Sequence, residues 1–383
     1  MKLTKILTTL LLPLHIALAV TGCERTETKG TNSAASSQDG KARQVATAPW
    51  THTAPKENIT VSEIEENSAM EIITETPDQK QAEEIREKTL ALVESRDFTA
   101  LDSVGADFLK SKERDAEGGW KLGDFYDSFE LRDNLPTPLW ERRRGFLEEW
   151  IAAKPESQTA RIALAQFYID YAWRARGSGY ADTVTEEGWR LMGERLEKSG
   201  NSLGEAAEKL TITDPMFFQT GLKVLLGAGG SPDSFDGLVA GSLEIAPDYW
   251  GSLSARAYSL LPRWHGETGD WEAFAKFIAE ENDPYGKEQY AFIVLQRHAF
   301  DSSSVDPRRL DWDLFKKSVR ELFEKYPEAV TNISRAAFIA TVADDRDFAK
   351  ECFALLGDRC VPAVWKVNGR MCHYRNWANT GKW

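Results

Sequence analysis

The chain has 383 residues, of which 42% are hydrophobic and 11% aromatic, so it has enough apolar side chain to bury a substantial core. Its 47 lysines and arginines stand against 60 aspartates and glutamates, a formal net charge of −13. This sign is unfavourable for coating phosphates, so we predict no nucleic-acid partner. The length suits one large domain or two of ordinary size.

The first 22 residues have the organisation of a secretory signal peptide. Lys2 and Lys5 provide positive charge before an apolar stretch that is too short and too interrupted to span a bilayer. The stretch ends in Val20-Thr21-Gly22-Cys23, which resembles the lipobox of bacterial lipoproteins, in which the cysteine is diacylated. We therefore predict a signal peptide over residues 1–22 and a lipid anchor at Cys23; an ordinary secretory signal with a chance cysteine is the alternative.

These features predict an exported protein that is held on a lipid bilayer through acylated Cys23. The next residue is Glu24 and not aspartate, which favours the periplasmic face of the outer membrane over the inner membrane under the sorting rule of enteric-type bacteria. Residues 23–77 are rich in Thr, Ser, Ala, Glu and Gln and show almost no apolar periodicity, so we predict a disordered, flexible tether. A tether of this length reaches on the order of 40 Å.

Apolar residues recur at helical spacing from residue 78 to the end of the chain, and strand-like alternation is nearly absent. The expected apolar helix faces include, in chain order, Ile85, Thr89, Leu92 and Val93; Phe98, Leu101, Val104 and Phe108; Trp140, Phe146, Leu147 and Trp150; Ile162, Tyr168, Ile169 and Trp173; Trp189, Met192 and Leu196; Phe274, Phe277 and Ile278; and Leu314, Val319, Leu322 and Phe323. We therefore predict one all-α domain over residues 78–383.

Proline follows five of the expected helix ends, at Pro155, Pro215, Pro247, Pro284 and Pro327. Three of the four intervals between these prolines are close to the period of about 34 residues that is typical of tetratricopeptide repeats, and the first is nearly double. We therefore predict an irregular, tetratricopeptide-like helical solenoid. An ordinary helical bundle, in which proline only ends helices, is the alternative.

Two segments combine tryptophan and arginine at expected helix ends, a combination that is typical of binding hot spots. They span residues 172–181 and 260–275, and their candidate ligand-binding residues are Trp173, Arg174, Arg176, Tyr180, Arg263, Trp264, His265 and Trp271. The alternative is that both segments hold the fold, with the tryptophans packed between helices and the arginines bound to carbonyl groups at helix C-termini.

The same two segments carry a family resemblance. Ala172-Trp173-Arg174-Ala175-Arg176-Gly177-Ser178-Gly179-Tyr180-Ala181 and Leu260-Leu261-Pro262-Arg263-Trp264-His265-Gly266-Glu267-Thr268-Gly269-Asp270-Trp271-Glu272-Ala273-Phe274-Ala275 are together similar to the bacterial domain of unknown function 4034 family. The resemblance covers about Gln79 to the C-terminus, and the second segment is its more specific part. It implies an all-helical, tetratricopeptide-like repeat fold. It implies no reaction, and the lipid anchor is an addition that it does not require.

Catalytic patterns in the sequence have structural explanations. Gly200-Asn201-Ser202-Leu203-Gly204 matches the nucleophile pattern Gly-x-Ser-x-Gly, but an amphipathic helix precedes it where that pattern needs a strand. We expect Gly200 to end this helix and Ser202 to cap the next one. Neighbouring acidic residues such as Glu148 and Glu149 point about 100° apart on a helix, so a catalytic carboxylate pair would have to come from distant helices. We predict no catalytic residue from these patterns.

Cysteine and histidine residues are few in the expected domain. No zinc-binding spacing is present, so we predict neither a metal nor a cofactor; Cys360 with Cys372 and His373 as half of a metal site is the weaker alternative. Cys352 has apolar helical neighbours, which indicate a buried position. We therefore favour a disulfide between Cys360 and Cys372, with three reduced thiols as the alternative.

These observations favour a lipid-anchored helical-repeat protein that acts as a scaffold for an unknown envelope protein, without catalysis. The alternative is a module that binds glycans or peptidoglycan through its tryptophan-rich turns. A hydrolase built on carboxylates from distant helices is less favoured.

Overall fold

The structure is a computed structural model, and it describes residues 70–366 and 368–382. The predicted signal peptide, Cys23 and the tether up to residue 69 lie outside the described residues. Within the described part almost all regular structure is helical, which confirms the all-α prediction. The helices and strands are β1 (Glu71–Ile72), α2 (Pro77–Ser95), α3 (Phe98–Ser111), α4 (Lys121–Asp127), α5 (Thr137–Ala153), α6 (Gln158–Arg176), α7 (Glu186–Lys209), α8 (Pro215–Ala228), α9 (Pro232–Ile245), α10 (Gly251–Ser259), α11 (Asp270–Glu281), α12 (Gly286–Phe300), α13 (Trp312–Lys325), α14 (Val330–Val342), α15 (Arg346–Leu356), β2 (Arg359–Cys360), α16 (Pro362–Trp365) and α17 (Asn368–Thr380), with short 3-10 turns at Ala181–Thr183, Ser302–Ser304 and Pro307–Arg309.

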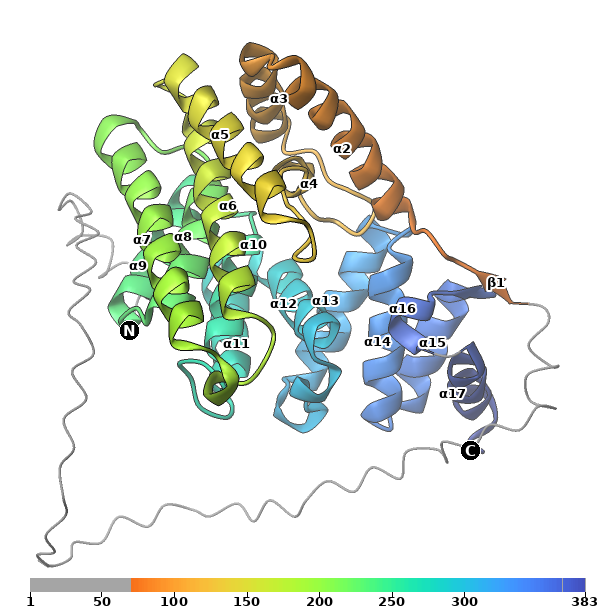
Figure 1. The fold of residues 1–383 in the computed structure, drawn as a ribbon. Coiled ribbons are helices and arrows are strands. Elements are labelled where there is room, and N and C mark those ends of the chain that lie inside the picture. The colour runs from red at the N-terminus through yellow and green to blue at the C-terminus, as the bar shows by residue number, and fades with distance from the viewer. Residues whose placement is uncertain (1–69, 367, 383) are drawn as a thin grey trace, which may run out of the picture.

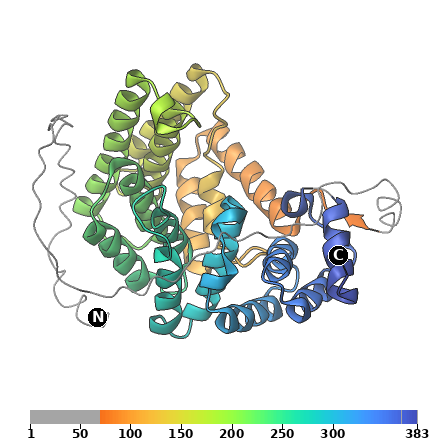
Figure 2. The same ribbon diagram turned by 90° about the horizontal axis from the view of Figure 1, so that it is seen from below.

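The helices follow one another in an arc (Figures 1 and 2). Successive helices pack side by side, most extensively α6 with α7, α14 with α15 and α11 with α12. The arc runs from α2 and α3 through α5 to α9, turns through α10 to α13, and returns with α14 to α17. At its end β2 pairs in parallel with β1, with Glu71 opposite Arg359 and Ile72 opposite Cys360. The two ends of the described chain therefore lie together.

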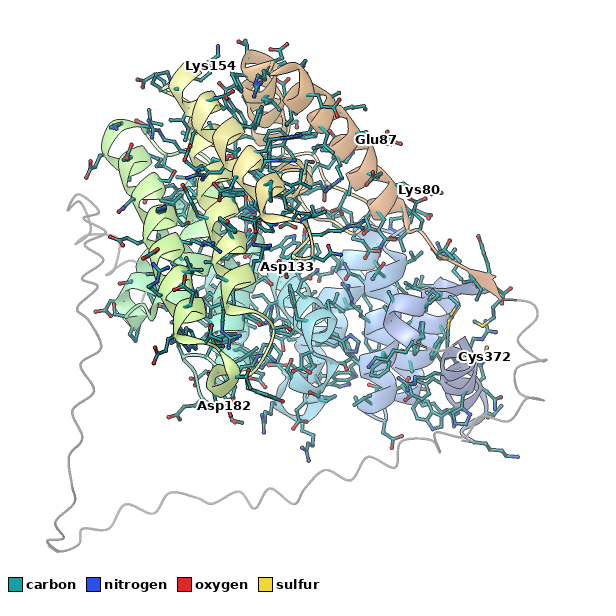
Figure 3. The ribbon with its side chains drawn as sticks, viewed as in Figure 1. Lys80, Glu87, Asp133, Lys154, Asp182 and Cys372 are labelled. Carbon is teal, nitrogen blue, oxygen red and sulfur yellow. The ribbon has the colours of Figure 1, made fainter. Side chains whose placement is uncertain are left out.

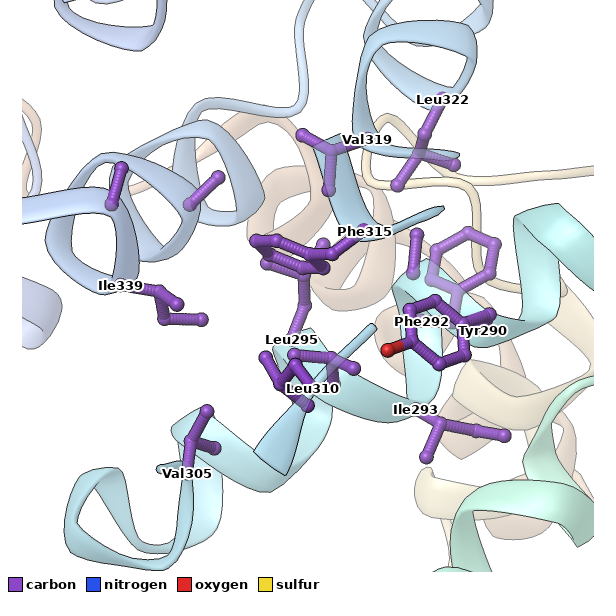
Figure 4. Packing of buried hydrophobic residues seen from close by; sticks show 14 of the residues in the cluster. Tyr290, Phe292, Ile293, Leu295, Val305, Leu310, Phe315, Val319, Leu322 and Ile339 are labelled. Carbon is purple, nitrogen blue, oxygen red and sulfur yellow. The ribbon is translucent and has the colours of Figure 1, made fainter. Parts of the chain in front are cut away.

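Side chains fill the space between the helices and form two hydrophobic cores (Figure 3). The N-terminal core contains Trp140 and Trp150 of α5 together with buried residues of α3, α4, α6 and α7. The C-terminal core extends from α8 to α17, and Figure 4 shows part of it, with Leu295 from α12 and Phe315 from α13. Helix α8 belongs to both cores, because Phe217 packs in the first and Leu222 in the second. The boundary between the cores therefore runs through α8.

Local sequence signals set most helix ends. Ser157 accepts a hydrogen bond from the Ala160 backbone N–H at the start of α6, as an N-cap residue does. Pro155 lies in the turn before α6, as the sequence predicts. Pro215 occupies the first position of α8. Proline is favoured there because a backbone N–H at this position would have no hydrogen-bond partner within the helix. Proline thus marks helix boundaries here, at starts as well as at ends.

Helix α7 departs from the prediction at Gly200. It continues without a break from Glu186 to Lys209, so Gly200 does not end it and Ser202 does not cap a new helix. The hydroxyl of Ser202 instead donates to the Arg161 carbonyl at 3.0 Å, and that of Ser199 donates to the Ala165 carbonyl at 2.7 Å. Small side chains on this face let α7 lie close against α6, and this packing outweighs the low helix propensity of glycine.

Residues 112–120, between α3 and α4, form a loop that we call the bridging loop because it connects distant parts of the chain. The Glu117 carboxylate accepts hydrogen bonds from the backbone N–H groups of Thr331 and Asn332, both at 2.8 Å, at the start of α14. Arg114 forms an ion pair with Asp248 at 3.0 Å, in the turn before α10. The bridging loop therefore fixes both cores around the region where they meet.

Candidate functional site

A cavity of about 540 Å³ lies at the boundary between the two cores, and we call it the central cavity. Its walls come from the bridging loop and α4, from α8, from α10 with the turn before it, and from the end of α12. The volume is within the range of small-molecule sites, which occur preferentially where two packed units meet. Segments far apart in the sequence thus contribute to one concave surface.

Aromatic side chains line one part of the central cavity. The Trp120 ring lies edge-on to Tyr249 with ring centroids 5.3 Å apart, and Trp250 stacks on Phe292 at 4.9 Å. Phe300, at the end of α12, is 68% exposed although it lines the cavity. Exposed faces of large rings can bind apolar faces of a ligand, including those of a sugar ring.

Carboxyl groups line another part of the cavity. Asp124, Asp127 and Glu130 come from α4 and the residues just after it, and Asp170 of α6 interacts electrostatically with Asp127 and Glu130 behind this wall. We call these four residues the acidic cluster. Lys223 of α8 is the cation close to Asp127 and Asp170.

The surroundings of Asp124, Asp127 and Asp170 raise the pKa of each of these carboxyl groups and favour their protonated form. Burial, followed by the negative charges of Asp115 and Asp127, raises the pKa of Asp124 to about 7. Burial and the charge of Glu130 raise the pKa of Asp170 to about 8, although Lys223 opposes this change. Groups with such pKa values both donate and accept hydrogen bonds near neutral pH, and they are concentrated at functional sites in proteins.

Arg297, near the end of α12, brings the opposite charge to the central cavity. Its guanidinium carbon lies 4.9 Å from the centroid of the Tyr258 ring and 5.2 Å from that of Phe300. The residue is only 1% exposed, and burial lowers its pKa to about 10, so it is a cation at neutral pH. The cavity therefore combines aromatic rings, carboxyl groups, the ammonium of Lys223 and one guanidinium.

The two tryptophan and arginine segments come together in the structure but outside the central cavity. Trp173 at the end of α6 lies edge-on to Trp264, with ring centroids 5.7 Å apart. Arg174 donates to the carbonyls of Asp133 and Leu135, at 3.0 and 3.2 Å. These contacts favour the alternative interpretation, in which the two segments stabilise the fold.

The other sequence candidates in these segments have similar surroundings. Arg176 donates to the carbonyls of Gly177 and Gly179, and the His265 ring lies 3.1 Å from the Leu226 carbonyl. Arg263 forms an ion pair with Asp301 at 3.4 Å. Trp271 is 2% exposed, whereas Tyr180 is 86% exposed. Of the eight candidates, only Tyr180 is fully open to a ligand without a described side-chain partner. None of the eight lines the central cavity.

Cysteine positions agree in part with the sequence analysis. Cys352 is 1% exposed in α15, which confirms its predicted burial. Cys360 in β2 and Cys372 in α17 are thiols in the structure. Burial, and after it the nearby Cys372, raises the pKa of Cys360 to about 11. Figure 3 shows Cys372 at the C-terminal end of the arc. The disulfide between Cys360 and Cys372 stays a prediction.

Residues 70–366 and 368–382 contain neither a cluster of metal ligands nor a membrane-spanning helix. No group of three or more His, Cys, Asp or Glu side chains in this part of the chain is arranged to hold a metal ion. None of its helices has both the length and the apolar character needed to cross a bilayer.

Sequence reasoning missed the central cavity, although one local signal was present. Asp124, Asp127 and Glu130 recur every third residue, which places them near one another along one side of a helical segment. No spacing relates these residues to Asp170 or Arg297, which the fold brings to the same region. Comparison of the chain with protein-family models, curated proteins and solved structures gives no match, so the family resemblance stays a prediction and function has to be argued from the cavity.

Proposed function

We propose that the protein is a lipid-anchored binding protein of the bacterial envelope that holds saccharide-containing fragments of peptidoglycan in its central cavity. The observation that carries this proposal is the combination, in one cavity of about 540 Å³, of the exposed Phe300 ring and other aromatic rings with carboxyl groups whose pKa values are raised to about 7. Sugar rings present apolar faces that stack on aromatic rings, and their hydroxyl groups form hydrogen bonds with carboxyl groups.

A scaffold for another envelope protein is the second candidate function. Helical-repeat arcs commonly bind proteins along an extended surface. Such an interface buries about 800 Å² on each partner and is enriched in large apolar side chains. In the described part of the chain the exposed large hydrophobic residues come one each from different segments, namely Ile72, Leu139, Tyr180, Trp189, Phe277, Tyr285, Phe300 and Leu355. The central cavity is therefore the better supported recognition site.

Membrane attachment in this proposal rests on the sequence before residue 24. We expect the wild-type protein to incorporate labelled palmitate and to sediment with the outer membrane, because two or more acyl chains give stable anchoring. Cys23→Ser should lose both properties while keeping the same ligand affinity, since the cavity lies in the folded domain. Palmitate labelling of the Cys23→Ser protein would contradict anchoring at this residue.

Ligand binding at the cavity is tested with a pair of phenylalanine variants. Phe300 is 68% exposed and lines the cavity, whereas Phe277 is 39% exposed on α11 and does not line it. We expect Phe300→Ala to weaken the binding of lysozyme-released peptidoglycan fragments about tenfold, because one aromatic face is lost, and Phe277→Ala to leave it unchanged. Isothermal titration calorimetry measures both affinities.

The same experiment separates the alternatives. Equal affinities for wild type and Phe300→Ala would place binding elsewhere on the protein. Shortened fragments, detected by mass spectrometry after incubation, would show hydrolysis instead of binding alone. No binding to any fragment, together with reproducible crosslinking of one envelope protein in cells, would favour the scaffold function.

A further inference from the structure

Arg297 lacks the hydrogen-bond acceptors that a buried arginine normally has. In the described part of the chain its Nε and Nη1 atoms are buried and have no acceptor, so neither atom is paired with a carboxylate. The rings of Tyr258 and Phe300 cover its guanidinium. Cation–π contacts of this kind satisfy the faces of the guanidinium, but its N–H groups point outward in the plane and remain unpaired.

The other buried arginines of the described chain show what is missing. Arg161, 6% exposed, pairs with Glu205 at 3.1 Å. Arg256, 7% exposed, pairs with Asp236 at 2.9 Å. Arg297 is the most buried of the three and is the one without an anion. Because removing a cation from water without a partner is costly, an unpaired guanidinium in a cavity wall is a site for an anion from outside the chain.

We propose that Arg297 binds a carboxylate group of the ligand in the central cavity. A guanidinium presents parallel N–H groups that match the two oxygens of a carboxylate. Asp115, Asp124, Asp127 and Glu130 line the same cavity, and each of them disfavours a group of higher negative charge, such as a phosphate, when it is ionised. This inference rests on the proposed function and specifies it: the ligand is recognised by its carboxylate as well as by its sugar rings.

The carboxylate can come from a peptide stem or from an acidic sugar, and the stem is the expected source because the amino sugars of peptidoglycan are largely uncharged. The main probe is a peptidoglycan disaccharide-tetrapeptide, compared with the same molecule after conversion of its carboxylates to carboxamides. We expect amidation to weaken binding to the wild type about tenfold to a hundredfold, which corresponds to loss of a charged hydrogen-bonded pair. Binding of an oligogalacturonate instead would identify an acidic sugar as the source.

Variants assign this discrimination to Arg297. In Arg297→Gln both forms of the probe should bind with the same weak affinity, and Arg297→Lys should recover part of the preference, because it restores the charge without the planar fork. Arg263→Gln is the matched control: Arg263 also lies over Tyr258, at 5.3 Å, but it is paired with Asp301 and does not line the cavity. It should keep the wild-type preference. Circular dichroism and thermal unfolding establish that each variant is folded.

Each outcome has a definite meaning. Equal wild-type affinity for the carboxylate and carboxamide forms overturns the inference but leaves the proposed function in place. If neither form binds, the proposed function fails, and N-acetyl-alanine then tests Arg297 alone. If N-acetyl-alanine raises the melting temperature of the wild type but not that of Arg297→Gln, the result supports the carboxylate site. If it raises both melting temperatures equally, or neither of them, the result overturns the carboxylate site.

Discussion

Trp140→Ala lowers the free energy of unfolding by about 3–5 kcal/mol, the usual cost of removing a fully buried tryptophan. Trp140 has 0% exposure in α5, and its ring stacks on Tyr171 of α6 with centroids 5.1 Å apart and an interplanar angle of 16°. Phe167 contacts the same ring at 5.7 Å, and the guanidinium of Arg174 lies over it at 5.4 Å. Alanine leaves a cavity between α5 and α6 that neighbouring side chains fill only in part.

Urea unfolding measures this loss, and Trp189→Ala is its control. Trp189 is 42% exposed on α7, so its removal should change the free energy of unfolding by less than about 1 kcal/mol. Equal destabilisation by the two substitutions would mean that the packing of α5 against α6 does not stabilise the N-terminal core as the structure indicates.

The wild-type protein should lose about 2–3 kcal/mol of stability as the pH rises from about 6.5 to about 8.5. The pKa values of Glu117 and Asp124 are raised to about 7 and that of Asp170 to about 8, in each case first of all by burial. Between the unfolded values near 4 and these folded values, the folded protein holds more protons than the unfolded chain. Its stability therefore falls as the pH rises through this window. Partial contact of these carboxyl groups with water screens their charges and reduces the expected loss of stability.

A histidine acts in the opposite direction at lower pH. Burial lowers the pKa of His298 to about 4, so the folded protein resists its protonation and loses stability as the pH falls below the ordinary histidine value of about 6.5. Above that value His298 is neutral in both states. The loss of stability at higher pH therefore reports the carboxyl groups.

Asp170→Asn isolates one of these groups. The amide cannot ionise beside Asp127 and Glu130, so the variant should be more stable than wild type by about 1–2 kcal/mol at about pH 8.5 and nearly equal to it at about pH 5. Asp182→Asn, at an exposed position, is the control and should follow the wild-type profile. Denaturant unfolding at a series of pH values gives both profiles. A wild-type profile that is flat above pH 6.5 would contradict the raised pKa values of Asp124 and Asp170.

Helical periodicity predicted the fold class because many of the helices bury one apolar face, and the residues of that face recur in consecutive turns of the sequence. Phe315, Val319 and Leu322 show this on α13, where all three are buried. Gly200 shows the limit of such local signals. Glycine often ends a helix, but close packing of α7 on α6 stabilises the helix through this position.

The candidate site could be predicted only where its residues are close in sequence. Asp124 and Asp127 have a recognisable spacing, yet the same spacing occurs on ordinary solvated helix faces. Arg297 lies in an apolar helix far along the chain, and its lack of an anion becomes visible only once every neighbour has been placed. The tryptophan and arginine segments attracted attention because their composition is local, whereas the cavity depends on long-range placement.

The pairing of β1 with β2 gives the molecule a defined mechanical attachment point. The backbone N–H of Glu71 donates to the Asp358 carbonyl at 2.9 Å, and that of Ile73 donates to the Cys360 carbonyl at 2.8 Å. Tension applied to the chain before residue 70, as an anchor at Cys23 would apply it, reaches these two bonds first. A pull along the strand stretches both bonds together, and the force passes into the segment between α15 and α16. While these two bonds hold, they shield the helices around the central cavity from that tension.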